Sequence, residues 1–524
     1  MILIFHTGNK VSGVELTAEQ GSMKNSGFLG LTLPKVLTKL GAKFPEELLV
    51  WCREDLKDGI NLREIPSLIS NPLSLVTYRK SGDSFDFLMD YLDYSTSIKV
   101  QTDVRYPTWK MSSTVGVAYG KLFKEISISE FELQDGDFYL AALAKAYQPF
   151  GLMSYHEPKL LLPGSYPVSE NHLGFSAAFR FARQVFSLQW AFFLFVALII
   201  FEGKWKIFPF LRSLFSKKPT VDPKVLDKLR PRSPSIDPKK ISLDVLIPTL
   251  GRESYVLQLL KDLAVQTIIP NKIIIVEQER EKGIGSQMPF LTEESWPFEI
   301  DHIFSVQRGP CYARNLGLGK VSSDWLFMAD DDIRLENGLL ESILSQMKSL
   351  NVEAATISCL LKDQVEENKY PHQTRIFGAG CSIVKSEIIQ NVRFDEAYEF
   401  GYAEDSDFGA QIRNLGHDVI YVPSPTILHL KAPMGGFRAP VTFPWDNESP
   451  KPKPSPTVML FWKRHFSPKQ FQGNKLMLFS KFFAKRKISN PIQFVNDFKA
   501  KWNVSFEYTN KLDSGELKTN PVNA

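Results

Sequence analysis

Short apolar runs alternate with stretches of helical spacing along the first 164 residues. The strand-like runs are Ile2–Phe5 and Glu47–Cys52, and the helix-like stretches are Leu33–Leu40, Phe85–Tyr94 and Asp137–Tyr147. Strand-length runs that alternate with helical segments are typical of an α/β layer structure. We therefore expect residues 1–164 to form a small α/β accessory domain.

The same alternation returns after residue 242. Leu243–Pro248 and Lys272–Val276 are predicted strands, and the amphipathic stretch Ser254–Val265 between them is a predicted helix. The strand ends of such a strand–helix–strand unit line a nucleotide crevice. Glu277 and Gln278 end the second strand, where they can hydrogen-bond a base or a ribose.

The apolar run Trp325–Ala329 carries three consecutive carboxylates, Asp330, Asp331 and Asp332, at its far end. Three adjacent acids cost too much free energy to bury unpaired, so this strand must end beside water or a bound cation. Alternation along a strand points Asp330 and Asp332 to one side and Asp331 to the other. The two acids on one side can hold a hard divalent ion, and a solvated acidic turn is the alternative.

The most hydrophobic part of the chain is Val185–Phe201, within a segment, residues 180–215, that has basic residues on both sides. As a helix this run covers about 25 Å, which is less than the ~30 Å of a bilayer core. Trp190 and Trp205 can anchor it at an interface. We expect attachment to the cytoplasmic face of the cell membrane. A spanning helix, a helix inserted at the surface and a helix buried between domains all remain open.

Two further regions differ in composition. Residues 216–241 are rich in proline and charge, which discourages helices and strands and predicts a linker. Residues 447–524 predict a basic amphipathic helical tail, either in contact with anionic lipid or packed on the preceding domain. A final helix is expected from Asn490 to about Trp502, and the last dozen residues are expected to be disordered.

Composition limits the classes of function. Of the 524 residues, 44% are hydrophobic and 23% are charged, as in an ordinary globular protein. A net charge of +4 is too small to indicate a nucleic-acid partner. The cysteines are scattered, which predicts neither a zinc site nor a disulfide framework: Cys52, Cys311, Cys359 and Cys381. Because Met1–Lys10 has no basic residues before its apolar stretch, no secretory signal is expected.

Four motifs in the second half resemble one known family. They are IPTLGR (247–252), KIIIVEQ (272–278), RGPCYARNLGL (308–318) and DWLFMADDDI (324–333). In this order they are similar to the family 2 glycosyltransferases of GT-A fold, which carry a DXD motif at the acidic strand end. The resemblance implies a nucleotide-binding mixed α/β sheet flanked by helices for residues 242–446, preceded by the smaller α/β domain and the hydrophobic helix. The family usually has Asp where this chain has Glu277.

The resemblance also implies a donor site. The residues expected to bind the nucleotide sugar are Pro248, Thr249, Arg252, Glu277, Arg314, Asn315, Asp330 and Asp331. Arg314 offers a planar fork for phosphate or for the acidic cluster, and Asn315 can brace the loop that follows Gly309. A divalent cation, Mn²⁺ or Mg²⁺, is the implied cofactor, with Asp330, Asp332 and His429 as its ligands. A lone histidine in an apolar strand can also be an ordinary core residue.

A second acidic segment, Glu404–Asp407, lies at the start of a predicted helix, Asp407–Leu415. Acids at this place can serve only as complements of the helix dipole. The resemblance implies an acceptor site, with Asp405 as catalytic base and with Glu404 and Asp407 orienting the acceptor hydroxyl. Gly380, in the glycine-rich run Phe377–Val384, lets the backbone lie close to a sugar. A lid is expected from the glycines and cations that follow His429, namely Lys431, Gly435, Gly436 and Arg438.

These residues together predict an inverting, metal-dependent hexosyltransferase in surface polysaccharide or glycolipid biosynthesis. Its expected partners are a nucleotide-diphosphate sugar, a glycan or lipid-linked acceptor, and a membrane surface. Deprotonating the acceptor and stabilising the leaving diphosphate are separate tasks, which suits two acidic clusters apart in sequence. The alternative is a non-catalytic membrane-bound scaffold or glycan-binding protein that retains the fold. A nucleotidyltransferase would need a glycine-rich basic loop after the first strand.

The first domain contains a faint echo of the acceptor motif. Asp135 and Asp137 precede a predicted helix, as Asp405 and Asp407 do. This similarity raises the idea that residues 1–164 are a degenerate copy of the GT-A domain. No acidic cluster stands at the expected distance upstream, so an accessory role is favoured over a second active transferase.

Overall fold

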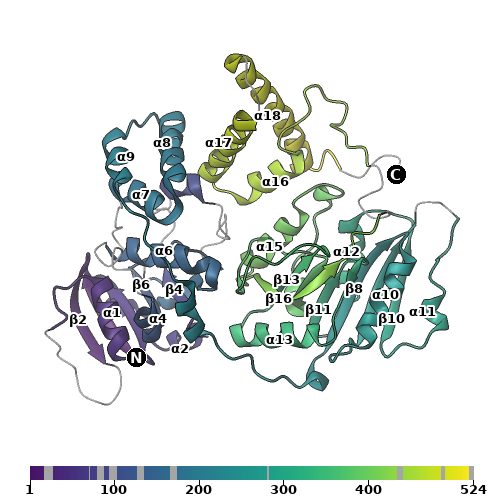
Figure 1. The fold of residues 1–524 in the computed structure, drawn as a ribbon, viewed down its shortest axis with the longest axis horizontal. Helices are drawn as coiled ribbons and strands as arrows, with labels where there is room; N and C mark the ends of the chain where they lie inside the picture. The colour runs from purple at the N-terminus through teal and green to yellow at the C-terminus, as the bar shows by residue number, and fades with distance from the viewer. Residues whose placement is uncertain are drawn as a thin grey trace. The chain divides into compact units, whose positions relative to one another are not determined.

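The structure is a computed structural model. It describes residues 1–16, 27–69, 71–79, 88–93, 103–126, 135–165, 174–279, 283–433, 441–485 and 490–518. The chain divides into two compact units, one formed by Met1–Arg232 with Ser467–Met477 and the other by Ser233–Phe466 with Leu478–Ala524. Each unit contains its own β-sheet with helices packed on it (Figure 1).

The first unit is built on a seven-stranded sheet of order β2-β1-β3-β6-β4-β7-β5. Its strands are β1 (Ile2–Thr7), β2 (Lys10–Leu16), β3 (Leu48–Arg53), β4 (Ser74–Tyr78), β5 (Tyr106–Pro107), β6 (Val115–Tyr119) and β7 (Met153–His156). Its helices include α1 (Leu33–Lys43), α2 (Ile65–Leu68), α4 (Gly120–Glu125) and α6 (Gly136–Tyr147). Within the predicted helix Phe85–Tyr94, residues 88–92 are helical and Asp93 is extended, whereas residues 85–87 and Tyr94 lie outside the described residues.

Three helices follow this sheet in the first unit: α7 (Phe175–Phe181), α8 (Leu188–Glu202) and α9 (Ile207–Leu214). Helix α8 is shorter than the apolar run because Ser187 is extended and Gly203 ends the helix in a left-handed conformation with φ of 64°. One face of α8 packs into the core of this unit through Ala191, Leu194 and Leu198. Among the helices that the structure describes, none is both long enough and apolar enough to cross a bilayer.

The predicted linker contains local structure. A 3₁₀ helix spans Pro223–Leu229, and a shorter one spans Pro238–Lys240. Leu226 and Leu229 are buried in the core of the first unit. The prediction that this segment has no helix is therefore wrong for Pro223–Leu229, because two apolar side chains in a proline-rich stretch are enough to fix it onto a core.

The second unit is built on a mixed sheet of order β10-β9-β8-β11-β15-β13-β16-β12, with β14 paired to β16. Its strands are β8 (Leu243–Leu250), β9 (Lys272–Gln278), β10 (Glu299–Ser305), β11 (Trp325–Ala329), β12 (Ile333–Arg334), β13 (Ala354–Leu360), β14 (His372–Gln373), β15 (Cys381–Lys385) and β16 (Ile420–His429). The neighbours β10, β9, β8 and β11 run parallel, and β15 is antiparallel to β11. This parallel half brings several strand ends to one edge, which is where a site can form.

Helices cover this sheet and extend beyond it (Figure 1). They are α10 (Glu253–Ala264), α11 (Phe290–Glu293), α12 (Pro310–Leu318), α13 (Leu339–Leu350), α14 (Ser386–Ile389), α15 (Glu404–Asn414), α16 (Pro456–His465) and α18 (Pro491–Asp513). Helix α17 (Pro468–Lys485) belongs to the first unit up to Met477 and to the second unit from Leu478. Helix α12 packs on β8 and β9, and α13 packs on β13 and β16. The C-terminal region is helical, but α18 extends to Asp513, well past Trp502. Its last turns are held by the buried residues Ser505, Thr509 and Leu512, and the hydroxyls of Ser505 and Thr509 donate to the carbonyls of Pro454 and Pro456. Residues 519–524 lie outside the described part.

Candidate active site

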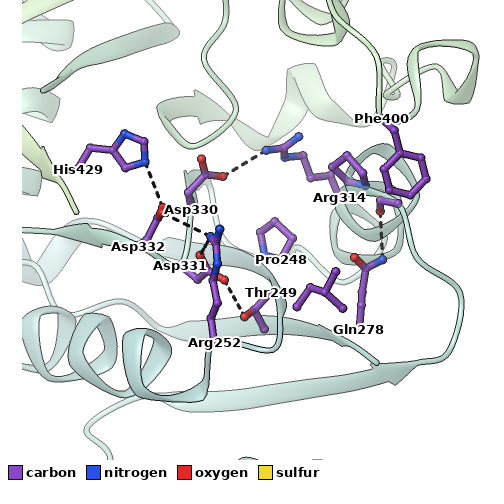
Figure 2. Close-up of a pocket in the computed structure, with 13 residues that line it drawn as sticks. Pro248, Thr249, Arg252, Gln278, Arg314, Asp330, Asp331, Asp332, Phe400 and His429 are labelled. Carbon is purple, nitrogen blue, oxygen red and sulfur yellow. Dashed lines mark hydrogen bonds and ion pairs between the residues drawn. The ribbon is translucent and has the colours of Figure 1, made fainter. Parts of the chain in front are cut away.

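A cavity of about 210 Å³ lies at the carboxyl ends of β8 and β11 (Figure 2). Its lining consists of Pro248, Thr249, Leu250, Arg252, Gln278, Gly309, Pro310, Arg314, Asp330, Asp331, Asp332, Phe400 and His429. The strand ends bring these residues together because β8, β9 and β11 are parallel neighbours and α12 packs across them. All three acids of the DXD segment and both predicted arginines therefore face one space.

The three aspartates occupy different environments. The side chain of Asp330 is 42% exposed, whereas Asp331 and Asp332 are buried. Asp331 accepts hydrogen bonds from Thr249 Oγ1 at 2.8 Å and from Arg252 Nη1 at 2.6 Å (Figure 2). Burial raises the pKa of Asp331 to about 6, and Arg252 opposes that rise. The prediction that Asp331 points away from the other two is wrong, because β11 ends at Ala329 and the alternation of a strand does not continue through the acids.

The guanidinium group of Arg314 is ion-paired to the described residues through only one of its three nitrogens. Its Nη2 lies 3.2 Å from Asp330 Oδ1, and the guanidinium lies over the ring of Phe394. Its Nε and Nη1 are buried and have no hydrogen-bond partner among the described residues. Burial would lower the pKa of Arg314, but the charges of Asp330, Asp405 and Glu404 outweigh it and raise that pKa. A buried cation with two unsatisfied N–H groups at a cavity wall is suited to an oxyanion ligand.

The residues predicted to bind a metal are only partly assembled. Nε2 of His429 lies 3.3 Å from Asp332 Oδ1, and Asp332 also accepts the backbone N–H of Ala432 at 2.9 Å. Within the described ranges, no group of three or more His, Cys, Asp and Glu side chains is arranged to hold a metal ion. Asp332 and His429 still present one oxygen and one nitrogen donor to the cavity, beside the exposed carboxylate of Asp330. This donor set suits a divalent cation whose remaining ligands come from diphosphate oxygens.

The N-terminus of α12 is occupied by a carboxylate of the protein. Glu399 is fully buried and accepts hydrogen bonds from the backbone N–H groups of Cys311 at 2.8 Å and Tyr312 at 3.0 Å. Gly309 has a φ of 145°, and a Cβ there would lie 2.5 Å from the Glu399 carboxylate, so only glycine allows this approach. Burial raises the pKa of Glu399 to about 7, although the two backbone hydrogen bonds act in the opposite direction.

The predicted acceptor acids lie next to the donor acids through one loop. Ala379 N donates to Asp405 Oδ1 at 3.3 Å, and Asp330 N donates to Gly380 O at 3.0 Å. A Cβ at Gly380 would lie 2.2 Å from Asp330 Oδ2, so Gly380 packs against the DXD segment and leaves no room for a side chain. Burial raises the pKa of Asp405 to about 7 and also raises the pKa of Glu404, whereas Arg314 lowers both.

Several predicted site residues have other partners. Glu277 is buried and its carboxylate accepts from Ser286 Oγ and from Gln287 N at 3.1 Å, with His302 Nε2 at 2.8 Å. Burial would raise the pKa of Glu277, but the hydrogen bonds, led by the one from His302, lower it. Glu277 therefore fixes the 283–288 segment and does not line the cavity, whereas its neighbour Gln278 does.

Asn315 and Asp407 are also structural in this arrangement. Asn315 clamps the backbone of Phe394 through Nδ2 and Oδ1, at 2.7 and 2.9 Å. Asp407 is buried and lies 2.7 Å from Nε2 of His465 on α16. Helix α15 begins at Glu404, three residues earlier than predicted, so Asp407 lies in its first turn. Of the predicted lid, Lys431 is described, whereas Gly435, Gly436 and Arg438 lie outside the described residues.

Three lining residues were missed by sequence reasoning: Leu250, Pro310 and Phe400. Leu250 and Pro310 lie inside the IPTLGR and RGPCYARN motifs, so the motifs themselves could have indicated them. Phe400 comes from the loop before α15 and has a φ of 57°. Nothing in the local sequence signals its position.

Comparison with known proteins places the cavity within one family segment. Residues 244–405 match the family model described as glycosyl transferase family 2. The matched range contains β8 through Asp405 and nearly all of the cavity lining. No curated protein matches the sequence significantly.

Solved structures of glycosyltransferases are similar to part of the chain. S. aureus TarS 1-349 in complex with UDP-GlcNAc is 12% identical over 53% of this chain and 91% of that chain, with a TM-score of 0.35. The mannosyltransferase PcManGT from Pyrobaculum calidifontis, in complex with GDP-Man and Mn²⁺, is 16% identical over 53% and 75% of the two chains, with a TM-score of 0.30. GalNAc-T7 with UDP, GalNAc and Mn²⁺ is 13% identical over 37% of this chain, with a TM-score of 0.31. The chain spans 44% of the length of GalNAc-T7 and 60% of another TarS 1-349 structure, less than two thirds of either.

Proposed function

We propose that the second unit is an inverting glycosyltransferase that moves a sugar from a nucleotide-diphosphate sugar to a hydroxyl of a glycan or lipid-linked acceptor. The observation that carries this proposal is the position of Arg314. Its guanidinium pairs with Asp330 of the donor cavity and is raised in pKa by Asp405 and Glu404 of the acceptor segment. The two acidic clusters thus interact with the same arginine, which supports the proposal that donor and acceptor bind next to each other.

The donor half of this proposal rests on the cavity. Buried Arg314 and partly buried Arg252 supply positive charge, and Arg314 keeps two N–H groups for phosphate oxygens. Asp332 and His429, with Asp330 beside them, would hold the Mn²⁺ or Mg²⁺. A bound divalent cation would neutralise charge on the leaving diphosphate. Gln278, at the end of β9, is placed to contact the nucleoside.

The acceptor half rests on Asp405. A pKa near 7 lets this carboxylate take a proton from an acceptor hydroxyl at neutral pH. Attack by that hydroxyl on the anomeric carbon, on the face opposite the diphosphate, breaks the sugar–oxygen bond and forms the new glycosidic bond in one displacement. The proton passes to Asp405, the diphosphate leaves with the bonding electrons, and the anomeric configuration inverts. We place the reaction in surface polysaccharide or glycolipid assembly.

The test is a panel of nucleotide-diphosphate sugars and acceptors with Mn²⁺ and the full chain, analysed by product mass. The anomeric configuration of the product, measured by NMR, is expected to be opposite to that of the donor. Asp405→Asn is expected to lower transfer by roughly 10²- to 10⁴-fold while nucleotide binding persists. Glu387→Gln is the control, because Glu387 is an acid of the same unit whose side chain is 77% exposed. Nucleotide binding without turnover in every condition would instead support the non-catalytic alternative, and retention of configuration would contradict the single displacement.

A further inference from the structure

Large apolar side chains remain exposed on one part of the first unit. We define the α8–α9 surface as Phe192, Ile200, Trp205, Phe208, Leu211 and Phe215, all of which are exposed. Phe208 and Phe215 are 85% and 86% exposed, close to what a free chain would show. Because contiguous exposed apolar surface of this kind is rare on soluble monomers, it indicates a binding surface.

The exposed residues follow the helical repeat and so share one side of each helix. On α8, Phe192 and Ile200 lie eight residues apart, whereas Ala191, Leu194 and Leu198 form the opposite, buried side. On α9, Phe208 and Leu211 lie three residues apart, and Phe215, the C-cap of this helix, follows Leu211 by four residues. Phe210 on the other side of α9 stacks on Phe195 of α8 with ring centroids 4.8 Å apart. The two helices, drawn next to each other in Figure 1, are therefore fixed to each other by their inner sides.

The charge around this surface has one sign. Arg212, Lys217 and Lys218 are exposed beside the apolar residues of α9. Between Gly174 and Val221 the chain has a single acid, Glu202, and that carboxylate is paired with Lys204 and Lys469. An apolar surface bordered by cations complements a layer of anionic headgroups above an apolar interior.

We propose that the α8–α9 surface docks the first unit onto an anionic phospholipid membrane, with both helices lying in the plane of the interface. Helix α8 covers about 22 Å and already buries one side in the protein core, so it cannot cross a ~30 Å hydrocarbon layer. Insertion of the phenylalanines removes apolar surface from water, and Arg212, Lys217 and Lys218 meet the phosphates. A symmetric pair of two copies would instead bring like charges together, which disfavours self-association.

The test is flotation of the full chain with lipid vesicles. Binding is expected to vesicles of phosphatidylcholine mixed with phosphatidylglycerol, to weaken with added salt, and to be much weaker with phosphatidylcholine alone. The double variant Phe208→Asp/Phe215→Asp is expected to weaken binding by roughly 100-fold, because two inserted aromatic side chains are lost. Lys217→Glu/Lys218→Glu is expected to reduce binding to the anionic vesicles by about tenfold.

The matched control is Val365→Asp, which places the same charge at an apolar residue of the second unit that is 84% exposed. It is expected to leave vesicle binding unchanged. The proposal is overturned if the wild-type chain does not float with anionic vesicles, or if the Phe208/Phe215 variant floats as well as the wild type. A dimer of the lipid-free chain that this variant converts to a monomer, without any vesicle binding, would show that a second copy covers the surface.

A separate observation concerns the two sheets. Five strands of the first unit lie in the order β1-β3-β6-β4-β7, and five strands of the second unit lie in the order β8-β11-β15-β13-β16. In both sets, the fourth strand along the chain lies between the second and the third. The pair directions also agree, because each series runs parallel, antiparallel, antiparallel and parallel. The two five-stranded cores therefore have the same topology.

Two backbone N–H hydrogen bonds of the first unit each have a counterpart in the second unit, and they show which residues occupy equivalent positions. Arg53 N donates to Thr114 O, one residue before β6, as Asp330 N donates to Gly380 O, one residue before β15. Asp137, the second residue of α6, accepts from Ser113 N at 2.6 Å, two residues before β6. In the same way Asp405, the second residue of α15, accepts from Ala379 N, two residues before β15. Arg53 thus stands where the second unit has Asp330, and Asp137 where it has Asp405.

The differences between the copies affect donor binding. Arg53 carries the opposite charge to Asp330 and is ion-paired with Asp55. In place of the parallel strand β9, reached through α10, the first unit has the antiparallel hairpin strand β2. We infer that the first unit is a second copy of the same fold that has lost its donor site, so that the chain holds one nucleotide site. This inference rests on the proposed function of the second unit.

Calorimetric titration of the full chain with UDP or GDP and Mn²⁺ tests the inference. One nucleotide per chain is expected, and Arg252→Ala/Arg314→Ala is expected to remove it. Arg53→Ala and Asp137→Asn are expected to leave stoichiometry and turnover unchanged, with thermal unfolding showing that both variants fold. Binding of two nucleotides per chain would overturn the inference that the first unit has lost its donor site. Residual transfer in Asp405→Asn that disappears when Asp137→Asn is added would overturn it as well. Absence of nucleotide binding in the wild type would instead overturn the proposed function itself.

Discussion

Nη2 of Arg314 lies 3.2 Å from Oδ1 of Asp330, while Nε and Nη1 of the same guanidinium lack hydrogen-bond partners in the part of the chain that the structure describes. A half-paired arginine of this kind is costly unless a ligand completes it. The pairing fixes the fork in position, and Arg314 lines the cavity together with Arg252.

Arg314→Lys is expected to weaken binding of a nucleotide diphosphate by about 10- to 100-fold, because lysine keeps the charge but loses the planar fork. Arg393→Lys is the matched control, since Arg393 donates to the carbonyls of Ile389 and Val392 outside the cavity. Calorimetric titration with the nucleotide measures both variants. Equal affinities for Arg314→Lys and the wild type would show that this fork does not bind phosphate.

Turnover is expected to depend on the protonation of Asp405. With a pKa near 7, the carboxylate is mostly protonated at pH 5, so kcat is expected to rise about tenfold per pH unit and to level off above pH 7. Asp405→Asn is expected to lower kcat by roughly 10²- to 10⁴-fold on the plateau above pH 7 and by a smaller factor at pH 5, where the wild-type carboxylate is already protonated. A pH profile that is flat between pH 5 and 8 in the wild type would exclude Asp405 as the base.

The same residue has a consequence for stability. The pKa of Asp405 is raised above its unfolded value, so the folded state binds more protons between about pH 4 and 7 and stability falls as the pH rises through that window. Asp405→Asn removes this loss and is expected to raise the free energy of unfolding by roughly 1–3 kcal/mol at pH 8, with little change at pH 4. Thermal unfolding at the two pH values measures the difference. A variant less stable than the wild type at pH 8 would contradict the raised pKa.

His465 is expected to hold the acceptor helix in place. Its Nε2 lies 2.7 Å from the buried carboxylate of Asp407, so His465→Ala leaves that acid without a partner from α16 and is expected to cost about 2–4 kcal/mol of unfolding free energy. His417→Ala is the control, because the pair of His417 and Glu353 is partly exposed and is expected to contribute less than about 1 kcal/mol. Denaturant unfolding compares the two, and equal losses would contradict the structural importance of the buried pair.

A metal requirement is expected for turnover. Removal of divalent cations with EDTA is expected to abolish transfer, and Mn²⁺ is expected to restore it. His429→Ala is expected to raise the Mn²⁺ concentration needed for half-maximal rate by about 10- to 100-fold. The measurement is the initial rate against metal concentration. Full activity in EDTA would show that the arginines alone stabilise the diphosphate.

The sequence was sufficient where local pattern determined structure. The strand Trp325–Ala329 was predicted with its observed bounds, and the three acids after it lie at a cavity, because apolar runs and strand ends are local features. The roles of Glu277 and Asp407 could not be predicted, since each is fixed by a histidine far along the chain, His302 and His465. Such partners are brought together only by the fold.

One strand contains residues that normally interrupt strands. Strand β16 runs from Ile420 to His429 without a break, although it contains Pro423, Ser424 and Pro425. Its pairing with β13 changes register between Ile357 and Cys359, opposite these residues. Where the hydrogen-bond pairing of two strands is irregular, a residue without a backbone N–H, such as proline, is tolerated. The hydrophobic periodicity of the sequence does not reveal such an irregularity.

Glu399 determines where a phosphate group can find positive charge in this chain. The first N–H groups of α12, which elsewhere form a rigid backbone cradle for anions, are already neutralised by an internal carboxylate. A diphosphate bound in the cavity would therefore meet the guanidinium groups of Arg252 and Arg314, which are among the lining residues. Because Asp331 holds Arg252 at 2.6 Å and Asp330 holds Arg314 at 3.2 Å, we expect donor choice to depend on two side chains whose positions are set by these acids, and not on a helix dipole.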